Sequence, residues 1–68
     1  MSKIVLNGRE TELAEDLDLL SFLQSRQVKP ENLIVEWNGK ILTGKDPLET
    51  FKLQDGDTLN LFSMVGGG

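Results

Sequence analysis

Apolar residues along this chain fall mostly in short runs that alternate with polar positions, a pattern typical of half-buried β-strands. The first run, residues 4–6, is followed at once by Asn7-Gly8. This pair favours a type I′ turn, because both central residues of that turn need positive φ, and it therefore predicts a hairpin. A return strand is expected over residues 9–13, with its glutamates facing water and Leu13 facing the core.

The same signal recurs in the middle of the chain. Residues 33–37 form a second apolar run, Asn38-Gly39 follows it, and residues 40–42 return as the partner strand. A final strand is expected over residues 58–64, where polar and apolar side chains alternate. The pattern therefore predicts two hairpins and one closing strand.

The segment between the second hairpin and the closing strand is expected to be irregular. Leu48 and Phe51 are predicted to pack a short turn against the core, and Asp55 and Asp57 flank Gly56 in a tight turn. Two carboxylates this close could suggest a cation site. A calcium site needs six to eight oxygen ligands, however, so the sequence favours a turn.

One stretch between the two hairpins has helical rather than strand periodicity. Its apolar positions recur at helical spacing: Leu19, Leu20, Phe22 and Leu23. Asp16 and Asp18 are both candidate N-caps, because either side chain could accept a hydrogen bond from a free backbone N–H. Pro30 is expected to stop the helix. We therefore predict one amphipathic helix over about residues 18–27.

These elements predict an α+β fold, with a mixed sheet of four to five strands and one helix packed on one face. If the last strand lies beside the first, the two run parallel in the middle of the sheet. Alternation and helical spacing together predict the core: Ile4, Leu6, Leu13, Leu19, Phe22, Leu23, Val35, Trp37, Leu59 and Leu61.

The same alternation places a second set of side chains on the opposite, open face of the sheet: Val5, Ile34, Glu36, Asn60, Phe62 and Met64. Its apolar members are expected to neighbour one another. Because a contiguous exposed apolar patch usually marks a partner site, we predict a docking surface formed by five of these residues. They are Val5, Ile34, Glu36, Phe62 and Met64.

The composition removes several kinds of site. The sequence has no cysteine and no histidine, so it lacks the usual thiol nucleophile, the usual general base and the preferred zinc ligands. Its net charge of −4 makes a nucleic-acid partner unexpected. No long apolar stretch occurs, so we expect no membrane span, no signal peptide and a cytoplasmic location. We also expect no bound metal or cofactor.

The last three residues, Gly66, Gly67 and Gly68, stand apart from the rest of the sequence. Glycine packs no side chain and costs the most backbone entropy to order, so three in a row do not suit a structural terminus. They suit a tail that threads a narrow channel and presents its carboxylate to another protein; the plain alternative is a frayed chain end. We divide the chain into a folded domain, residues 1–65, and a flexible reactive tail, residues 66–68.

Taken in order, these motifs resemble the ubiquitin-like β-grasp family, and within it the ThiS-like sulfur carriers of thiamine biosynthesis. The resemblance rests on residues 35–39 (VEWNG), on the turn at residues 55–57 (DGD) and on residues 64–68 (MVGGG). It covers the whole chain, and its weight comes from the order and spacing of the motifs. The family's reactive end is often written with two glycines; here there are three, which places the reactive carboxylate on Gly68.

The resemblance implies a protein-bound sulfur donor rather than an enzyme. A ThiF-like adenylyltransferase would use ATP to convert the Gly68 carboxylate into an acyl-adenylate. A cysteine desulfurase would supply sulfur as a persulfide, and the resulting thiocarboxylate would donate that sulfur to a ThiG-like thiazole synthase. ATP would be used by the partner, since this chain has no phosphate-cradling loop before a helix.

Three alternatives remain open at the level of sequence. The small subunit of molybdopterin synthase shares the fold and the glycine end, but it is usually longer and often carries a proline shortly before the glycines. A non-reacting ubiquitin-like interaction module would bind through the sheet face, with an incidental tail. An enzyme is the least supported, because the chain has neither cysteine nor histidine.

Overall fold

In a computed structural model of the chain, residues 2–13 and 16–63 are described. They contain five strands, one α-helix and two short 3₁₀ helices. The strands are β1 (Ser2–Leu6), β2 (Arg9–Leu13), β3 (Leu33–Trp37), β4 (Lys40–Thr43) and β5 (Thr58–Ser63). The helices are α1 (Leu19–Ser25), η1 (Pro30–Asn32) and η2 (Leu48–Thr50).

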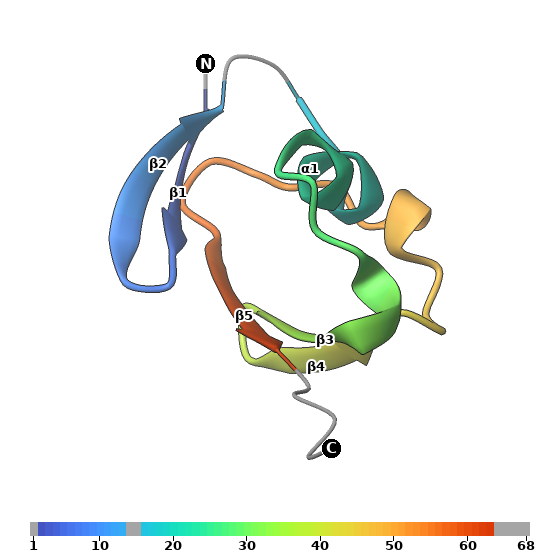
Figure 1. Cartoon of the computed structure of the whole chain (residues 1–68). Coiled ribbons are helices and arrows are strands. Elements are labelled where there is room, and N and C mark those ends of the chain that lie inside the picture. Colours follow the sequence, from blue (N-terminus) through green and yellow to red (C-terminus); the bar gives the residue numbers. More distant parts are fainter. Residues whose placement is uncertain (1, 14–15, 64–68) are drawn as a thin grey trace.

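All five strands form one mixed sheet in the order β2-β1-β5-β3-β4. The central pair, β1 and β5, is parallel, and the other neighbouring pairs are antiparallel. Helix α1 lies across one face and leaves the other open (Figure 1). The predicted α+β architecture is confirmed, including the parallel contact between the first and last strands.

Both predicted Asn-Gly turns have the expected backbone. Asn7 and Gly8 have φ of 49° and 83°, and Asn38 and Gly39 have φ of 50° and 86°, as a type I′ turn requires. Each asparagine also has a second role, which the turn signal did not reveal. The Oδ1 of Asn7 accepts a hydrogen bond from the backbone N–H of Leu61 at 2.8 Å, and the Oδ1 of Asn38 accepts one from that of Thr58 at 2.9 Å. Both hairpin ends therefore hold β5.

The helix begins where the sequence predicted but ends earlier. Asp18 is the N-cap, and its Oδ1 accepts a hydrogen bond of 2.7 Å from the backbone N–H of Ser21. This bond is the main reason that the pKa of Asp18 lies below its usual value. At the other end Gln27 adopts a φ of 59°, and its N–H and that of Val28 return to helix carbonyls in a Schellman motif. This left-handed turn ends α1, so Pro30 does not.

The core beneath the helix contains eleven buried apolar residues: Ile4, Leu13, Leu19, Phe22, Leu23, Leu33, Val35, Leu42, Leu48, Leu53 and Leu59. Three residues predicted for this set are only half-buried and pack against its edge, namely Leu6, Trp37 and Leu61. Three members were not predicted, namely Leu33, Leu42 and Leu53. The prediction that Leu48 and Phe51 pack against the core is confirmed.

Leu53 is buried because its segment pairs with the chain before α1. Its backbone N–H donates to the Leu17 carbonyl at 2.8 Å, and the N–H of Leu19 donates to the Phe51 carbonyl at 2.9 Å. An isolated β-bridge joins Asp18 to Lys52 between these two bonds. The segment appeared irregular in the sequence because this pairing spans more than thirty residues and has no local signal.

Gly44 is required by a close backbone approach. A Cβ added to it would lie 2.6 Å from the carbonyl oxygen of Pro30 and 3.1 Å from the Cα of Glu31. Both neighbours are main-chain atoms and cannot rotate away. The loop after β4 can therefore pack on η1 in this way only with glycine.

We expect Gly44→Ala to lower the free energy of unfolding by about 1–3 kcal/mol, because the added methyl must displace backbone. Urea denaturation followed by tryptophan fluorescence would measure the change. Lys45→Ala, at the exposed neighbouring position, is the matched control and should stay within about 0.5 kcal/mol of wild type. Equal denaturation midpoints for Gly44→Ala and wild type would contradict the close approach.

Candidate functional site

The open face of the sheet carries an apolar patch, formed by the half-buried Ile34 on β3 and the exposed Ile41 on β4 and Phe62 on β5. Ile34 and Phe62 are direct partners in the β3–β5 ladder. Phe62 is 51% exposed and Ile41 is 58% exposed, the two most exposed large apolar side chains of the described residues. The prediction that Ile34 and Phe62 neighbour one another on this face is confirmed.

Ile41 was not predicted to belong to this surface, although the sequence held the information. The two-residue Asn38-Gly39 turn pairs Trp37 with Lys40, and the next pair outward is Glu36 with Ile41. Since partners in a ladder share a face, Ile41 must point to the same side as Glu36. Turn length alone was therefore enough to place it.

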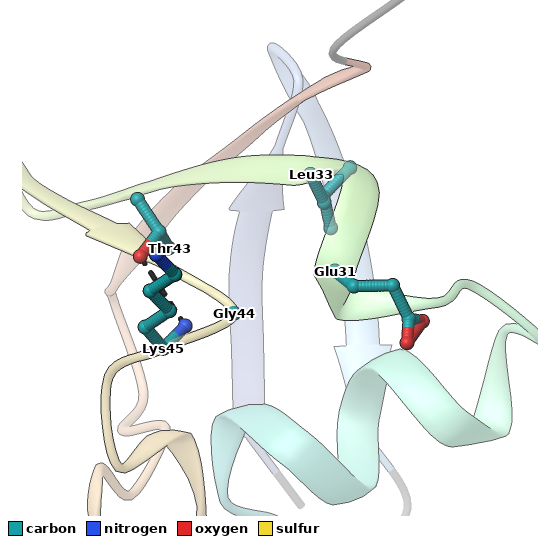
Figure 2. A pocket seen from close by; sticks show the side chains of 5 residues that line it. All are labelled: Glu31, Leu33, Thr43, Gly44 and Lys45. Carbon is teal, nitrogen blue, oxygen red and sulfur yellow. Dashed lines mark hydrogen bonds between the residues drawn. The ribbon is translucent and has the colours of Figure 1, made fainter. Parts of the chain in front are cut away.

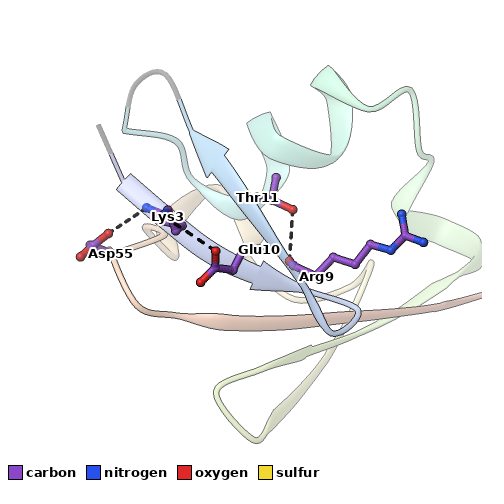
Figure 3. A network of polar contacts seen from close by, with 5 residues as sticks. All are labelled: Lys3, Arg9, Glu10, Thr11 and Asp55. Carbon is purple, nitrogen blue, oxygen red and sulfur yellow. Dashed lines mark hydrogen bonds and ion pairs between the residues drawn. The ribbon is translucent and has the colours of Figure 1, made fainter.

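Val5 faces the same side but does not join the apolar patch, contrary to prediction. It pairs with Thr58 on β5 and with Glu10 on β2. Phe62 lies four residues beyond Thr58, about 13 Å along the strand at roughly 3.3 Å per residue. The surroundings of Val5 are charged, since Lys3 and Glu10 form an ion pair of 3.9 Å beside it (Figure 3).

Glu36 lies within the apolar patch, between Ile41 on one neighbouring strand and Asn60 on the other. Its Oε1 accepts a hydrogen bond of 2.8 Å from the side-chain Nδ2 of Asn60. Glu36 was predicted on this face and is confirmed there, half-buried. The side-chain contact that fixes its carboxylate was not predicted.

The remaining predicted site residues, Met64, Gly66, Gly67 and Gly68, lie outside the described residues, as does the proposed domain boundary after residue 65. The described chain stops with β5 at Ser63, opposite Leu33 of β3. Strand β5 is paired with β1 at Thr58 and Leu59 and with β3 from Leu59 to Ser63. The last described residue, Ser63, directly follows Phe62 of the apolar patch.

The start of β5 is held by a buried carboxylate, Asp57, which is 9% exposed. Its Oδ2 accepts hydrogen bonds from the Trp37 indole N–H at 2.9 Å and the Gln54 backbone N–H at 2.8 Å; its Oδ1 accepts one of 3.1 Å from Asn38 Nδ2. Burial acts to raise the pKa of Asp57, but the three hydrogen bonds outweigh it and hold the pKa below its usual value. This carboxylate stabilises the fold and has no free oxygen for chemistry.

The predicted turn before β5 is confirmed, with Gly56 at φ 89° and the Asp57 N–H donating to the Gln54 carbonyl. The other carboxylate of this turn belongs to Asp55, and it accepts a 2.8 Å hydrogen bond from the backbone N–H of Lys3 (Figure 3). The two aspartates do not converge. Within residues 2–13 and 16–63, no group of three or more acidic side chains is placed to hold a metal ion.

A shallow hollow of about 370 Å³ lies beside the start of β3 and the end of β4. Glu31 and Lys45 stand on opposite sides of it, and Leu33, Thr43 and Gly44 complete its lining (Figure 2). The hydrogen bond among these residues joins near neighbours in the sequence: the Lys45 backbone N–H donates to Thr43 Oγ1 at 3.3 Å. The hollow therefore lacks the converging polar groups of a cofactor site. In the described part of the chain, no helix is long and apolar enough to cross a membrane.

A five-stranded mixed sheet with a parallel central pair and one helix across its face defines a ubiquitin-like β-grasp domain. The chain belongs to the ThiS family, whose sequence model matches residues 3–68. It is similar to the crystal structure of the thiamine biosynthesis protein ThiS from Geobacter metallireducens, with 28% identity and a TM-score of 0.80. The match covers 97% of this chain and 99% of that protein. A search of curated protein sequences finds no match.

Family membership supports a sulfur carrier of thiamine biosynthesis over the other readings of the sequence. The family match extends through Gly68, so the glycines lie within the shared pattern rather than beyond it. This argues against an interaction module with an incidental tail. The similarity to a solved thiamine biosynthesis protein favours the thiamine pathway over the molybdopterin synthase subunit.

Proposed function

We propose that this protein carries sulfur for thiazole formation on the carboxylate of Gly68, with Gly66 and Gly67 as the segment that enters partner active sites. The observation that carries the proposal is the ThiS family match, which runs to Gly68. The fold supports it, because β5, the last strand before the glycines in the sequence, is paired with β3 as far as Ser63. A tail on a rigid strand can be aimed by whatever binds the adjoining sheet face.

The chemistry needs a partner enzyme at each step. A carboxylate is a poor electrophile, so a ThiF-like adenylyltransferase would let it attack the α-phosphate of ATP, releasing pyrophosphate and leaving an acyl-adenylate. The terminal sulfur of a persulfide, supplied through a cysteine desulfurase, would then attack the acyl carbon and displace AMP. A second thiol would cleave the resulting S–S bond and leave the thiocarboxylate, which would pass its sulfur to a ThiG-like thiazole synthase. The chain has no cysteine, so every thiol must come from a partner or a reductant.

Intact mass spectrometry tests this function directly. The purified protein, with Gly68 as its last residue, would be incubated with ATP, the adenylyltransferase from the same genome, a persulfide donor and a thiol reductant. Replacing one oxygen by sulfur raises the mass by the difference between those two atoms, and omission of ATP should abolish that gain. A wild-type protein that never gains sulfur with its cognate partner would disprove the proposed function.

The docking surface for these partners is proposed to be the apolar patch together with Glu36. We expect Phe62→Asp to weaken binding to the adenylyltransferase by at least tenfold, because the new charge would be desolvated without a partner in the complex. The free domain should stay folded, since Phe62 is half-exposed. Isothermal titration calorimetry would measure the binding, and circular dichroism the fold.

Gln27→Asp is the control for this prediction. It adds the same charge at an exposed position after α1, away from the open face, and aspartate tolerates the positive φ found there. Its affinity should remain within about twofold of wild type. Ile34→Asp should behave like Phe62→Asp, since the two residues are direct partners. Wild-type affinity for Phe62→Asp would exclude the open face as the docking surface.

A further inference from the structure

Among residues 2–13 and 16–63, Glu36 is the one charged side chain within the apolar patch of the open face. Along β3 it follows Ile34 on the same face, and across the sheet it lies between Ile41 and Asn60. Phe62 is diagonal to it, because Phe62 pairs with Ile34. Any partner that covers Ile34 and Phe62 must therefore also cover the Glu36 carboxylate.

The carboxylate is held in place but not neutralised. Asn60 Nδ2 donates to its Oε1 at 2.8 Å, and Asn60 is itself neutral. Within residues 2–13 and 16–63, the side-chain ion pair is Lys3 with Glu10, at the other end of the sheet, and no cation lies within 4.0 Å of Glu36. The Oε2 atom accepts no hydrogen bond from these residues. Among the described residues, no cation therefore pairs with this charge.

When a partner covers the Glu36 carboxylate, it removes water from the charge and so changes the free energy of the ionised form. An ionised carboxylate that loses water without gaining a cation is strongly destabilising, whereas the same carboxylate is favourable when a well-placed donor meets it. The hydrogen bond from Asn60 already restricts the rotamers of the Glu36 side chain. Binding a well-placed donor therefore costs less conformational entropy, and a surface without one cannot be accommodated by moving the side chain away. A partner surface that is apolar or acidic at this point would be rejected.

We propose that Glu36 is the charge-recognition point of the docking surface, and that the partner's interface places an arginine guanidinium on its free Oε2. This inference rests on the proposed function, since it assumes that the adenylyltransferase covers the apolar patch. Arginine suits the position better than lysine, because its guanidinium is more weakly hydrated and its flat face can lie against Ile34, Ile41 or Phe62. The chain's net charge of −4 would steer a basic interface toward it.

The decisive variant is Glu36→Gln. It keeps the shape and the oxygen that accepts from Asn60, removes the charge, and replaces the free Oε2 acceptor by an NH2 donor. Affinity for the adenylyltransferase should fall at least tenfold, and its dependence on salt between about 50 and 500 mM should weaken, because one desolvated ion pair is lost. Glu36→Lys should bind at least a hundredfold more weakly than wild type, since it sets two cations against each other.

Glu12→Gln is the matched control, with the same change of charge at an exposed position on the edge strand β2. It should retain affinity within about twofold and keep the wild-type salt dependence. Wild-type affinity or wild-type salt dependence for Glu36→Gln would overturn the inference and leave the proposed function standing. A wild-type protein that is never adenylated would instead overturn the proposed function itself.

Discussion

Deleting Gly68 should abolish thiocarboxylate formation while leaving partner binding nearly unchanged. The deletion moves the terminal carboxylate back by about 3.3–3.6 Å, the span of one extended residue. Reaction requires the attacking oxygen and the phosphorus of ATP to approach to about 3–3.5 Å, so this shift alone removes the productive geometry. Docking should survive, because the apolar patch and Glu36 lie on the sheet rather than on the tail.

Two further variants distinguish the effect of the tail's length from the effect of side-chain bulk in the tail. Gly68→Ala keeps the length of the tail and adds one methyl group, so it should retain more activity than the deletion. Gly67→Val keeps the length but adds a branched side chain inside the channel, and it should react far more slowly than wild type. Intact mass spectrometry gives the rate of sulfur gain, and calorimetry gives the affinity. Sulfur gain by the Gly68 deletion at the wild-type rate would show that Gly68 is not the reacting residue.

Replacing Asp57 with alanine should lower the free energy of unfolding by about 2–4 kcal/mol. The substitution leaves the Trp37 indole N–H, the Gln54 backbone N–H and the Asn38 side-chain amide without their shared acceptor. These groups are part-buried, so water replaces the lost carboxylate only in part. In a domain this small the loss is a large fraction of the total stability, which is on the order of 3–10 kcal/mol.

The effect of Asp57→Ala should also depend on pH. The pKa of Asp57 is lowered in the folded state, so its stabilising contribution is complete above the unfolded-state value of 3.8 and is lost as pH falls below it toward the folded-state pKa. The gap in stability between wild type and Asp57→Ala should therefore narrow in acid. Urea denaturation at pH 7 and near pH 3 would measure it.

Asp55→Ala is the control for this prediction. Asp55 is exposed and accepts one hydrogen bond, from the backbone N–H of Lys3, so its loss should cost about 1 kcal/mol or less. Similar losses for Asp55→Ala and Asp57→Ala at neutral pH would mean that the buried carboxylate does not anchor β5.

Much of this fold could be predicted from the sequence, because the turns, the helix cap and the strand faces depend on residues close together in the chain. Positive φ at Asn-Gly pairs is a property of two residues, so both hairpins and the register inside them followed directly. Asp18 capped the helix as expected because a cap bonds a backbone N–H only three residues away. Strand alternation placed Ile34, Glu36 and Phe62 on one face for the same reason, since the side-chain period of a strand needs no partner.

The tertiary structure decided what depends on pairing between distant segments. The parallel register of β1 with β5 separates Val5 from Phe62, and no local pattern encodes that offset. The contacts of Asn38 with Asp57 and Thr58, and of Glu36 with Asn60, likewise join residues that are at least nineteen apart in the sequence.

Sequence period thus determines which way a side chain points in this protein, while the packing of the whole sheet determines which side chains meet. The face of Glu36 was fixed by its place in an alternating strand. Its fixed carboxylate within an apolar surface exists only because β5 closes between β1 and β3 and brings Asn60 beside it. Non-local strand register is set by the core that all the elements bury together, and that core forms only when the chain folds as a unit.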